Sequence, residues 1–283
     1  MLKKRKTEEK IFKTIMIFCT LLIIIILFLI LISILLRGFS SLNFAMITQT
    51  PKGGYYLGKE GGILNAILGS ICLAGGATLL AMCISIPVAA YLTVFKQKGK
   101  FLPFMTRFAL DVLWGIPSIV YGAFAFIVML FLGLKASLLS GIIAIALVEL
   151  PIMTRSIDEV MKSVPEELKE ASLALGANEL ETTYVAIKQC TPGIVTSVLI
   201  AFGRGIGDAA AVMFTAGFSD YLPTSLFDPV ATLPLAIFFQ LNTPFVEVQN
   251  RAYASAFVLT MIILMTCWLS RILTKWFDKF VIK

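Results

Sequence analysis

Long uncharged apolar runs alternate with short polar segments along most of this 283-residue chain. The first run, residues 14–36, exceeds the roughly 20 residues that an α-helix needs to cross a bilayer. The apolar positions do not alternate with the period of two that a membrane β-barrel strand requires. The pattern therefore predicts an all-α, polytopic membrane helical bundle.

Six such runs are long enough to span, and the turn between the third and the fourth is short enough for a tight helical hairpin. A further uncharged run, 229–246, contains Pro234 and Pro244. We prefer a loop with a short interfacial or re-entrant helix there, and a seventh span is the alternative. The six predicted spans are 14–36, 64–95, 112–134, 136–154, 192–218 and 252–270.

Basic residues cluster before the first run, between the second and the third, and after the last. Cytoplasmic loops of membrane proteins carry such an excess of Lys and Arg, so both termini are expected in the cytoplasm of a multi-pass protein of the cell membrane. The first run is too long for a signal peptide and lacks a small-residue cleavage site, which predicts a retained anchor. The basic residues are Lys3, Lys4, Arg5 and Lys6, then Lys96, Lys98, Lys100 and Arg107, and finally Arg271, Lys275, Lys279 and Lys283.

Composition supports this class and excludes several others. Charged residues make up only 14% of the chain, against about 25% in a soluble domain. The net charge of +7 is explained by the cytoplasmic loops, so no nucleic-acid role is expected. Histidine is absent and the five cysteines form no CxxC pair, so we expect no catalytic site, no metal and no cofactor.

One polar segment, residues 162–192, interrupts the apolar chain between the fourth and fifth spans. It contains a helix start at Pro165, with Glu166 and Glu167 behind it, and a glycine stop at Gly176. The charge pattern puts it in the cytoplasm. A polar segment of this length is expected to contact something outside the membrane.

This segment carries a recognisable signature. Glu170, Ala171 and Ser172, followed after three residues by Gly176, resemble the EAA motif of type I ABC importer permeases. In that family the motif forms a cytoplasmic coupling helix that docks on the ATP-binding subunit. The later part, around Ala186 to Gln189, departs from the family pattern. The resemblance assigns the ATPase-coupling role to Glu170, Ala171, Ser172, Leu175, Gly176 and Ala177.

Two further stretches point to one group within this family. Residues 111–122, DVLWGIPSIVYG, are similar to a block of phosphate-specific permeases, and Gly203 to Asp208 is similar to their R-A-I-G-E-T block. The FTAGFS, LPLAIF and AYASA runs look more like the PstA-type subunit than its PstC-type partner. The resemblance covers the chain from about Gly61 onward.

The resemblance implies a MetI-like fold of six transmembrane helices with the coupling helix between helices 4 and 5. It implies an N-terminal part (1–62), a permease domain (63–275) with a coupling loop (156–190), and a tail (276–283). The implied function is that of a permease subunit that moves inorganic phosphate into the cytoplasm. The implied partners are a PstC-like permease, two copies of a PstB-like ATPase, an extracytoplasmic phosphate-binding protein, phosphate and membrane lipid. The chain has no G-K-S or G-K-T, so it lacks a Walker A loop and is not expected to be the ATPase itself.

Arg204 and Asp208 are the candidate residues of the substrate pathway. A charge inside a span is costly, at least about 2.5–3.5 kcal/mol, so Arg204 should face a bundle interior or a wet cavity and have a partner. Asp208 lies four residues on, on the same face of a continuous helix. The fork of an arginine can hold two oxygens of an oxyanion, and a carboxylate could accept the hydroxyl of a protonated phosphate.

Several alternatives remain open at this point. The Arg204–Asp208 pair could serve helix packing alone, and the solute could differ from phosphate. A secondary transporter, a channel or, last, a membrane enzyme are the alternatives from other classes. Glu149 is expected near the end of the fourth span, where it could snorkel. Asp111, four residues after Arg107, is expected to form a surface pair or a cap rather than a gate.

Overall fold

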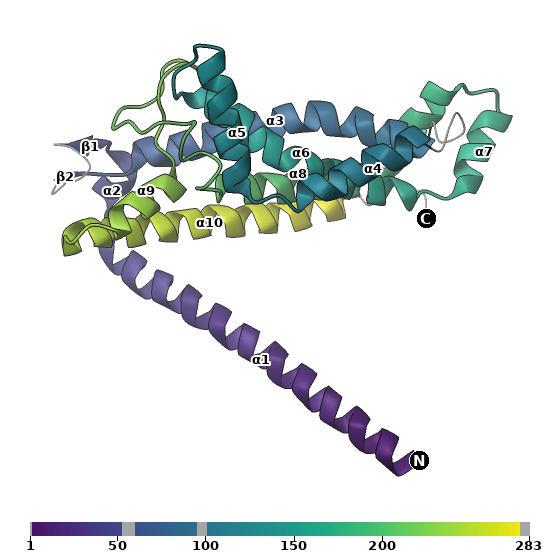
Figure 1. Ribbon diagram of the computed structural model, residues 1–283, viewed down its shortest axis with the longest axis horizontal. Helices are drawn as coiled ribbons and strands as arrows, with labels where there is room; N and C mark the ends of the chain where they lie inside the picture. The colour runs from purple at the N-terminus through teal and green to yellow at the C-terminus, as the bar shows by residue number, and fades with distance from the viewer. Residues whose placement is uncertain (1, 53–59, 95–100, 278–283) are drawn as a thin grey trace.

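The computed structural model describes residues 2–52, 60–94 and 101–277, and within them the chain forms a helical bundle with one small β-ribbon (Figure 1). The basic residues Lys96, Lys98, Lys100, Lys279 and Lys283 lie outside the described residues. The elements are α1 (Leu2–Ser41), α2 (Phe44–Thr48), β1 (Pro51–Lys52), β2 (Glu60–Gly61), α3 (Leu64–Val94), α4 (Phe101–Trp114), α5 (Ser118–Phe131), α6 (Leu138–Lys162), α7 (Glu166–Ala174), α8 (Glu179–Ile206), α9 (Leu233–Leu241) and α10 (Val246–Phe277).

The predicted polytopic helical membrane bundle is confirmed. In the described part of the chain, five helices are long and apolar enough to cross a bilayer: α1, α3, α6, α8 and α10. The sixth candidate is the bent pair α4 and α5, which meet at an angle of 102°, so the continuous third span predicted at 112–134 is wrong. The break falls at Ile116–Pro117, because a proline disfavours helical geometry in the residue before it and has no N–H to donate.

Two predicted boundaries are wrong. The fourth span does not end near residue 154, because α6 continues to Lys162. The fifth span does not cover 192–218, because α8 begins at Glu179, with a capping box between Asn178 and Glu181, and ends at Ile206. The helix ends in a glycine-rich stretch, where helix propensity is weak, and the carboxylate of Asp208 accepts the N–H of Ala211 at 3.0 Å instead.

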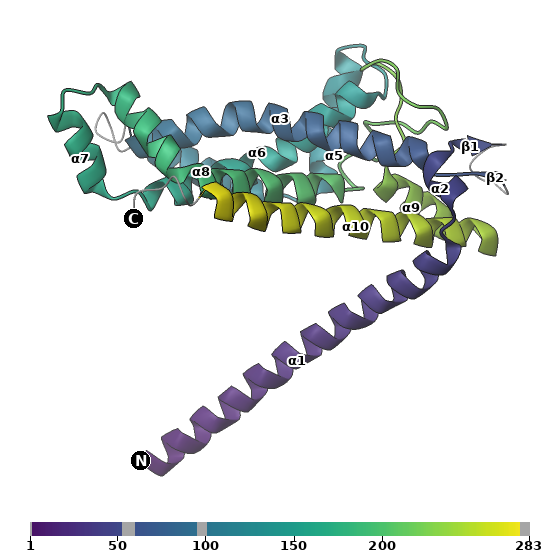
Figure 2. The ribbon, with the colours of Figure 1, turned by 180° about the vertical axis from the view of Figure 1, so that it is seen from behind.

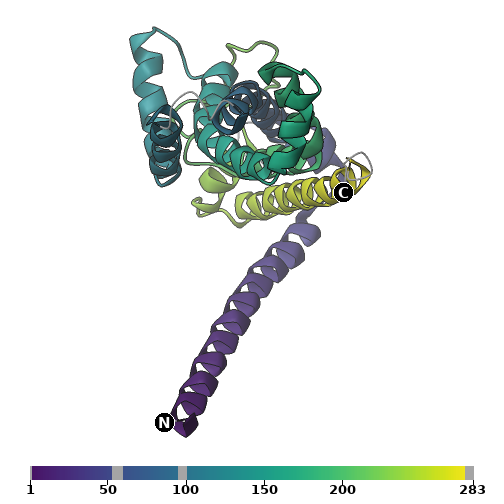
Figure 3. The same cartoon turned by 90° about the vertical axis from the view of Figure 1, so that its right-hand side faces the viewer.

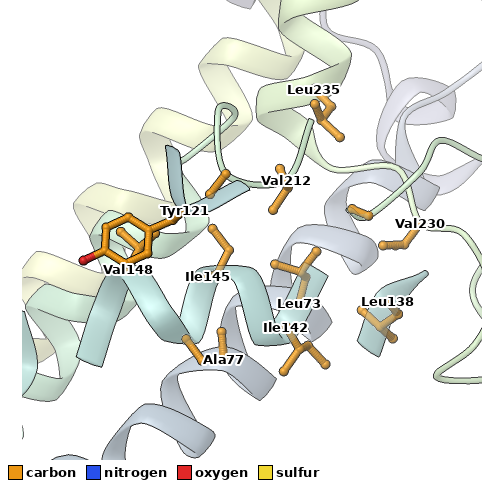
Figure 4. Packing of buried hydrophobic residues seen from close by; sticks show 13 residues of the cluster. Leu73, Ala77, Tyr121, Leu138, Ile142, Ile145, Val148, Val212, Val230 and Leu235 are labelled. Carbon is orange, nitrogen blue, oxygen red and sulfur yellow. The ribbon is translucent and has the colours of Figure 1, made fainter. Parts of the chain in front are cut away.

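Residues 207–232 form an irregular but packed segment. Its carbonyls accept the first N–H groups of α6: Leu138 N–H donates to Asp228 O and Leu139 N–H to Leu226 O, both at 2.8 Å. Val212 and Val230 from this segment join Leu73 of α3 and residues of α6 in one buried cluster (Figure 4). This segment therefore replaces the predicted second half of the fifth span.

The expectation of a short helix within 229–246 is confirmed. The helix α9 has nine residues, about 14 Å at 1.5 Å per residue, which is too short to cross the hydrocarbon layer. Its residues Leu233, Leu235 and Ala236 are buried, and Leu233 N–H donates to Ser70 Oγ of α3 at 2.7 Å. The helix is thus held inside the fold at the end opposite α7 (Figure 2).

The centre of the bundle is the packing of α3 against α6 and α8. Small residues line this contact, since Ala74, Ala77, Ala81 and Ala89 of α3 are fully buried, and small side chains let helices approach closely. By contrast, α1 diverges from the bundle and touches it only near its C-terminal end, where Gly38 lies against Tyr253 and Phe257 of α10 (Figure 3).

Candidate functional site

The helix α7 forms a separate lobe at one end of the bundle (Figure 1). It starts after Pro165 and ends at a left-handed Gly176, whose φ is +87°. Gly176 N–H donates to Leu173 O at 2.9 Å and Ala177 N–H donates to Ser172 O at 3.2 Å. These two bonds make a Schellman motif, which explains why a glycine stands there and why the chain turns. The predicted helix start and glycine stop are confirmed.

Most of the predicted coupling residues face away from the bundle. Glu170, Ala171, Leu175 and Gly176 are exposed, while Ser172 and Ala177 are half-buried. The Ser172 hydroxyl lies 3.2 Å from that of Thr182 in α8, which anchors the inner face of α7.

Beside these residues lies a group of exposed apolar side chains from α7, the turn after it and the start of α8. Leu175 is 90% exposed, so the described part of the chain leaves nearly all of this large apolar side chain uncovered. Grouped exposed apolar residues of this kind mark contact sites for another protein or for lipid. The group, called the α7 patch below, consists of Leu173, Leu175, Leu180 and Tyr184.

The second half of the polar segment is helical and continuous with the fifth span. Ala186 to Gln189, where the family pattern is lost, lies inside α8, and Pro192 lies inside the same helix. Residues 156–162 and 179–190 of the predicted coupling loop are therefore ends of the long helices α6 and α8, and only the part around α7 connects them.

A network of charges joins α3, α4 and α6 just before α7. Its centre is Asp158, which is fully buried. Arg107 of α4 contacts its carboxylate at 2.8 Å, Arg155 at 3.1 Å and Lys162 at 2.9 Å. Thr93 of α3 donates to it at 3.3 Å. Such a network fixes the ends of three helices relative to one another.

The pairing of this network differs from the expectation. Asp111 forms the expected surface pair, but its partner is Arg155 at 3.1 Å, because the nearby Arg107 contacts Asp158 instead. Our sequence reasoning missed Asp158. The i, i+3 and i, i+4 spacing of Arg155, Asp158 and Lys162 on one helix was the available signal.

Arg204 and Asp208 do not form the expected ion pair. No contact between them occurs in the part of the chain that the structure describes, because α8 ends between them and Asp208 instead bonds Ala211 N–H. Arg204 occupies the last turn of α8 and its side chain is exposed on the surface of this chain. The negative end of the helix dipole favours a cation at this position.

The space beside Asp208 is too small for an oxyanion. A cavity of about 10 Å³, lined among others by Ser70, Gly205, Asp208 and Thr232, lies next to it. That volume accommodates at most about one water molecule. A solute that reaches Arg204 in this conformation must therefore approach from the exposed surface of the chain rather than through its interior.

Glu149 is the second ionisable residue that lies elsewhere than expected. It sits in the middle of α6, it is fully buried and it contacts Gly205, the residue after Arg204. The expectation that it would snorkel to the end of a span is wrong, because α6 continues for more than three turns beyond it. In the described residues, no group of three or more acidic or cysteine side chains could hold a metal ion.

Comparison with known proteins agrees with this architecture. Residues 81–283 match the family model of the binding-protein-dependent transport system inner membrane component. Two similar curated proteins are both called phosphate transport system permease protein PstA. The one from Yersinia pestis is 33% identical over 84% of this chain and 80% of its own length, and the one from Mycobacterium leprae is 34% identical over 89% and 83%.

A solved structure shares the fold. A chain of the MetNI methionine ABC transporter, in an inward facing conformation, matches with a TM-score of 0.64 over 76% of this chain and 95% of its own. At 16% identity this likeness concerns the fold alone. From the matched family model and the PstA relatives it follows that this chain belongs to the binding-protein-dependent transport system inner membrane components, and among them to the PstA-type permeases.

Proposed function

We propose that this chain is the membrane-spanning permease subunit of an ABC importer that moves inorganic phosphate into the cytoplasm. The observation that carries the proposal is the combination of a membrane bundle with PstA relatives and a protruding α7 whose patch of apolar side chains is exposed on the described part of the chain. ATP hydrolysis belongs to a separate subunit in this proposal, since the chain has no Walker A loop.

The α7 patch and the six coupling residues form the docking surface for the ATP-binding subunit. Leu175 would fill an apolar pocket of that subunit, and Glu170 would meet a polar group at its rim. Motion of the ATPase would then pass through α7 and the charge network around Asp158 into α3, α4 and α6. With α7 in the cytoplasm, both chain termini lie there as well, in agreement with the positive-inside rule.

Arg204 belongs to the phosphate pathway in this proposal. Its exposed guanidinium faces away from the chain's own core, where a second, PstC-like permease would complete the pathway. A bidentate contact with two phosphate oxygens suits its planar fork. Asp208 lies four residues on and would accept a hydroxyl proton of phosphate, which sulfate lacks, once the surrounding elements move apart to admit the anion. An extracytoplasmic binding protein would deliver the anion on the side of the β-ribbon and α9.

The test uses the complex of this chain with its second permease, its ATPase and its binding protein, purified and placed in vesicles. Leu175→Glu should abolish co-purification of the ATPase, whereas Glu166→Gln, at the start of the same helix, should leave it intact. Arg204→Gln should leave co-purification intact and lower phosphate uptake at least tenfold.

Phosphate uptake that persists without ATP and in Leu175→Glu would instead identify a secondary transporter or a channel. ATP-driven uptake of a different solute would leave the importer class standing and overturn the substrate.

A further inference from the structure

Glu149 is a buried acid that the proposed function does not use. Its side chain is fully buried in the middle of α6. One carboxyl oxygen, Oε1, accepts a hydrogen bond from the hydroxyl of Thr78 in α3 at 3.2 Å. The other oxygen, Oε2, is buried and has no hydrogen-bond partner among the residues that the structure describes. The carboxyl group is therefore bonded by a single neutral donor.

The backbone of α8 encloses this acid on a third side, after α6 and α3. A Cβ atom added at Gly205 would overlap Oε1 of Glu149 and would lie 2.9 Å from Cγ2 of Ile145. Only glycine therefore allows α8 to lie this close to α6. The carboxyl group is enclosed by α3, α6 and α8 together.

No cation in the described part of the chain reaches this carboxyl group. On α8, the side chain of Arg204 is exposed, and Asp208 beyond the helix is itself acidic. On α6, Arg155 is six residues away, about 9 Å along the axis, and it contacts Asp111 and Asp158. The other charged or titratable groups on the packed elements are engaged or exposed elsewhere. Arg107 bonds Asp158, Lys162 bonds Asp158 and Glu159, the hydroxyl of Tyr121 on α5 donates to Leu113 O, and Cys72 and Cys83 of α3 are exposed.

We propose that Glu149 is a proton-binding site and holds its proton in the packed arrangement of α3, α6 and α8. An ionised carboxylate with one neutral donor and no cation is far less favourable in such a place than a neutral acid. Exit of the proton requires water or a cation to enter between α6 and α8, and thus requires these helices to separate next to Arg204. Close packing of α6 against α8, next to Arg204, therefore requires that Glu149 stays protonated and neutral.

Infrared spectroscopy of the purified complex in lipid at neutral pH tests the proposal without any assay of transport. The spectrum should contain a carbonyl band of a protonated carboxylic acid that is missing from Glu149→Gln, a variant of the same shape. Glu159→Gln, on the same helix but with an exposed, ion-paired carboxylate, is the matched control and should leave that band unchanged. Identical carboxylic-acid regions in the wild type and in Glu149→Gln would overturn the proposal.

A second variant covers the case in which Glu149→Gln does not fold. Thr78→Val removes the one hydroxyl that donates to Oε1, so the same carbonyl band should move to higher wavenumber while keeping its intensity. No shift in Thr78→Val would also overturn the proposal, because the band would then belong to another acid. The outcome is independent of the proposed transport function, which fails or stands on the uptake assay.

Discussion

The helices α1 and α6 are both candidate membrane spans, yet their surroundings differ completely. The apolar window of α1 is the more hydrophobic of the two, and none of it is buried within this chain, whereas 67% of the α6 window is buried. Lipid tails are as apolar as a leucine side chain, so apolarity inserts a helix into the bilayer without bringing it to other helices. What holds α6 in place is its packing against other helices: buried side chains such as Ile145 and Met153, together with small residues, hydroxyls and two buried acids.

Removal of the buried acid Asp158 should give the largest loss. Asp158→Ala leaves Arg107, Arg155 and Lys162 without their shared carboxylate, and breaking a buried ion pair on one side costs about 3–5 kcal/mol. The free energy of unfolding in a detergent titration measures the change. Glu159→Ala, on the same helix but exposed, should cost less than about 1 kcal/mol. Equal losses in the two variants would contradict a central role for the buried carboxylate.

An isoleucine pair compares the two helices directly. Ile145→Ala in α6 removes a fully buried side chain and should cost about 2–5 kcal/mol. Ile24→Ala in α1, where the side chain is 54% exposed, should change stability by less than about 0.5 kcal/mol, because lipid can fill the space. The same unfolding titration applies. A comparable loss in Ile24→Ala would show that α1 packs against protein in this state.

A glycine pair on α8 tests the close approach to α6. A Cβ at Gly193 would press on Val160, a stiff β-branched residue of α6, so Gly193→Ala should cost about 1–3 kcal/mol. Gly203→Ala meets no atom within 4 Å and should be neutral or more stable by up to about 1 kcal/mol, the gain in helix propensity. Thermal melting in the same detergent would rank the two variants. The reverse ranking would mean that α6 and α8 lie farther apart than described.

The smallest effect concerns the loop that covers the first residues of α6. The hydroxyl and N–H of Thr224 and the N–H of Ser225 donate to the carboxylate of Asp228, and they hold its pKa below the ordinary value. A lowered folded-state pKa stabilises the protein above about pH 4 and the benefit disappears as the pH falls further. We expect a small melting-temperature difference between wild type and Asp228→Asn at pH 6 that shrinks as the pH falls below about 4. A difference that stays constant as the pH falls would mean that the carboxylate's charge is irrelevant.

Apolar runs, charge placement and the glycine stop were sufficient to predict a polytopic helical bundle and the helix α7, but not the break between α4 and α5. They could not give the ends of α8, because the capping box of Asn178 and the hydrogen bond that Asp208 accepts from Ala211 N–H decide those ends locally. The sequence also could not tell that Arg204 is exposed while Glu149 is buried. Hydropathy separates residues that tolerate lipid from those that do not. Whether a side chain is buried depends also on the neighbouring helix, which must present a small residue to it, as Gly205 does to Glu149.

The isolation of α1 has a consequence for the order in which the protein is made. A helix that needs no partner from its own chain can settle in the bilayer as soon as it leaves the ribosome. The helix α6 cannot settle in the same way, since its central acid is enclosed only once Gly205 of α8 has been synthesised. Until then α6 must stay at the insertion machinery or packed against α3. The biosynthesis of this chain therefore has an early step that is autonomous and a later step that waits for downstream sequence.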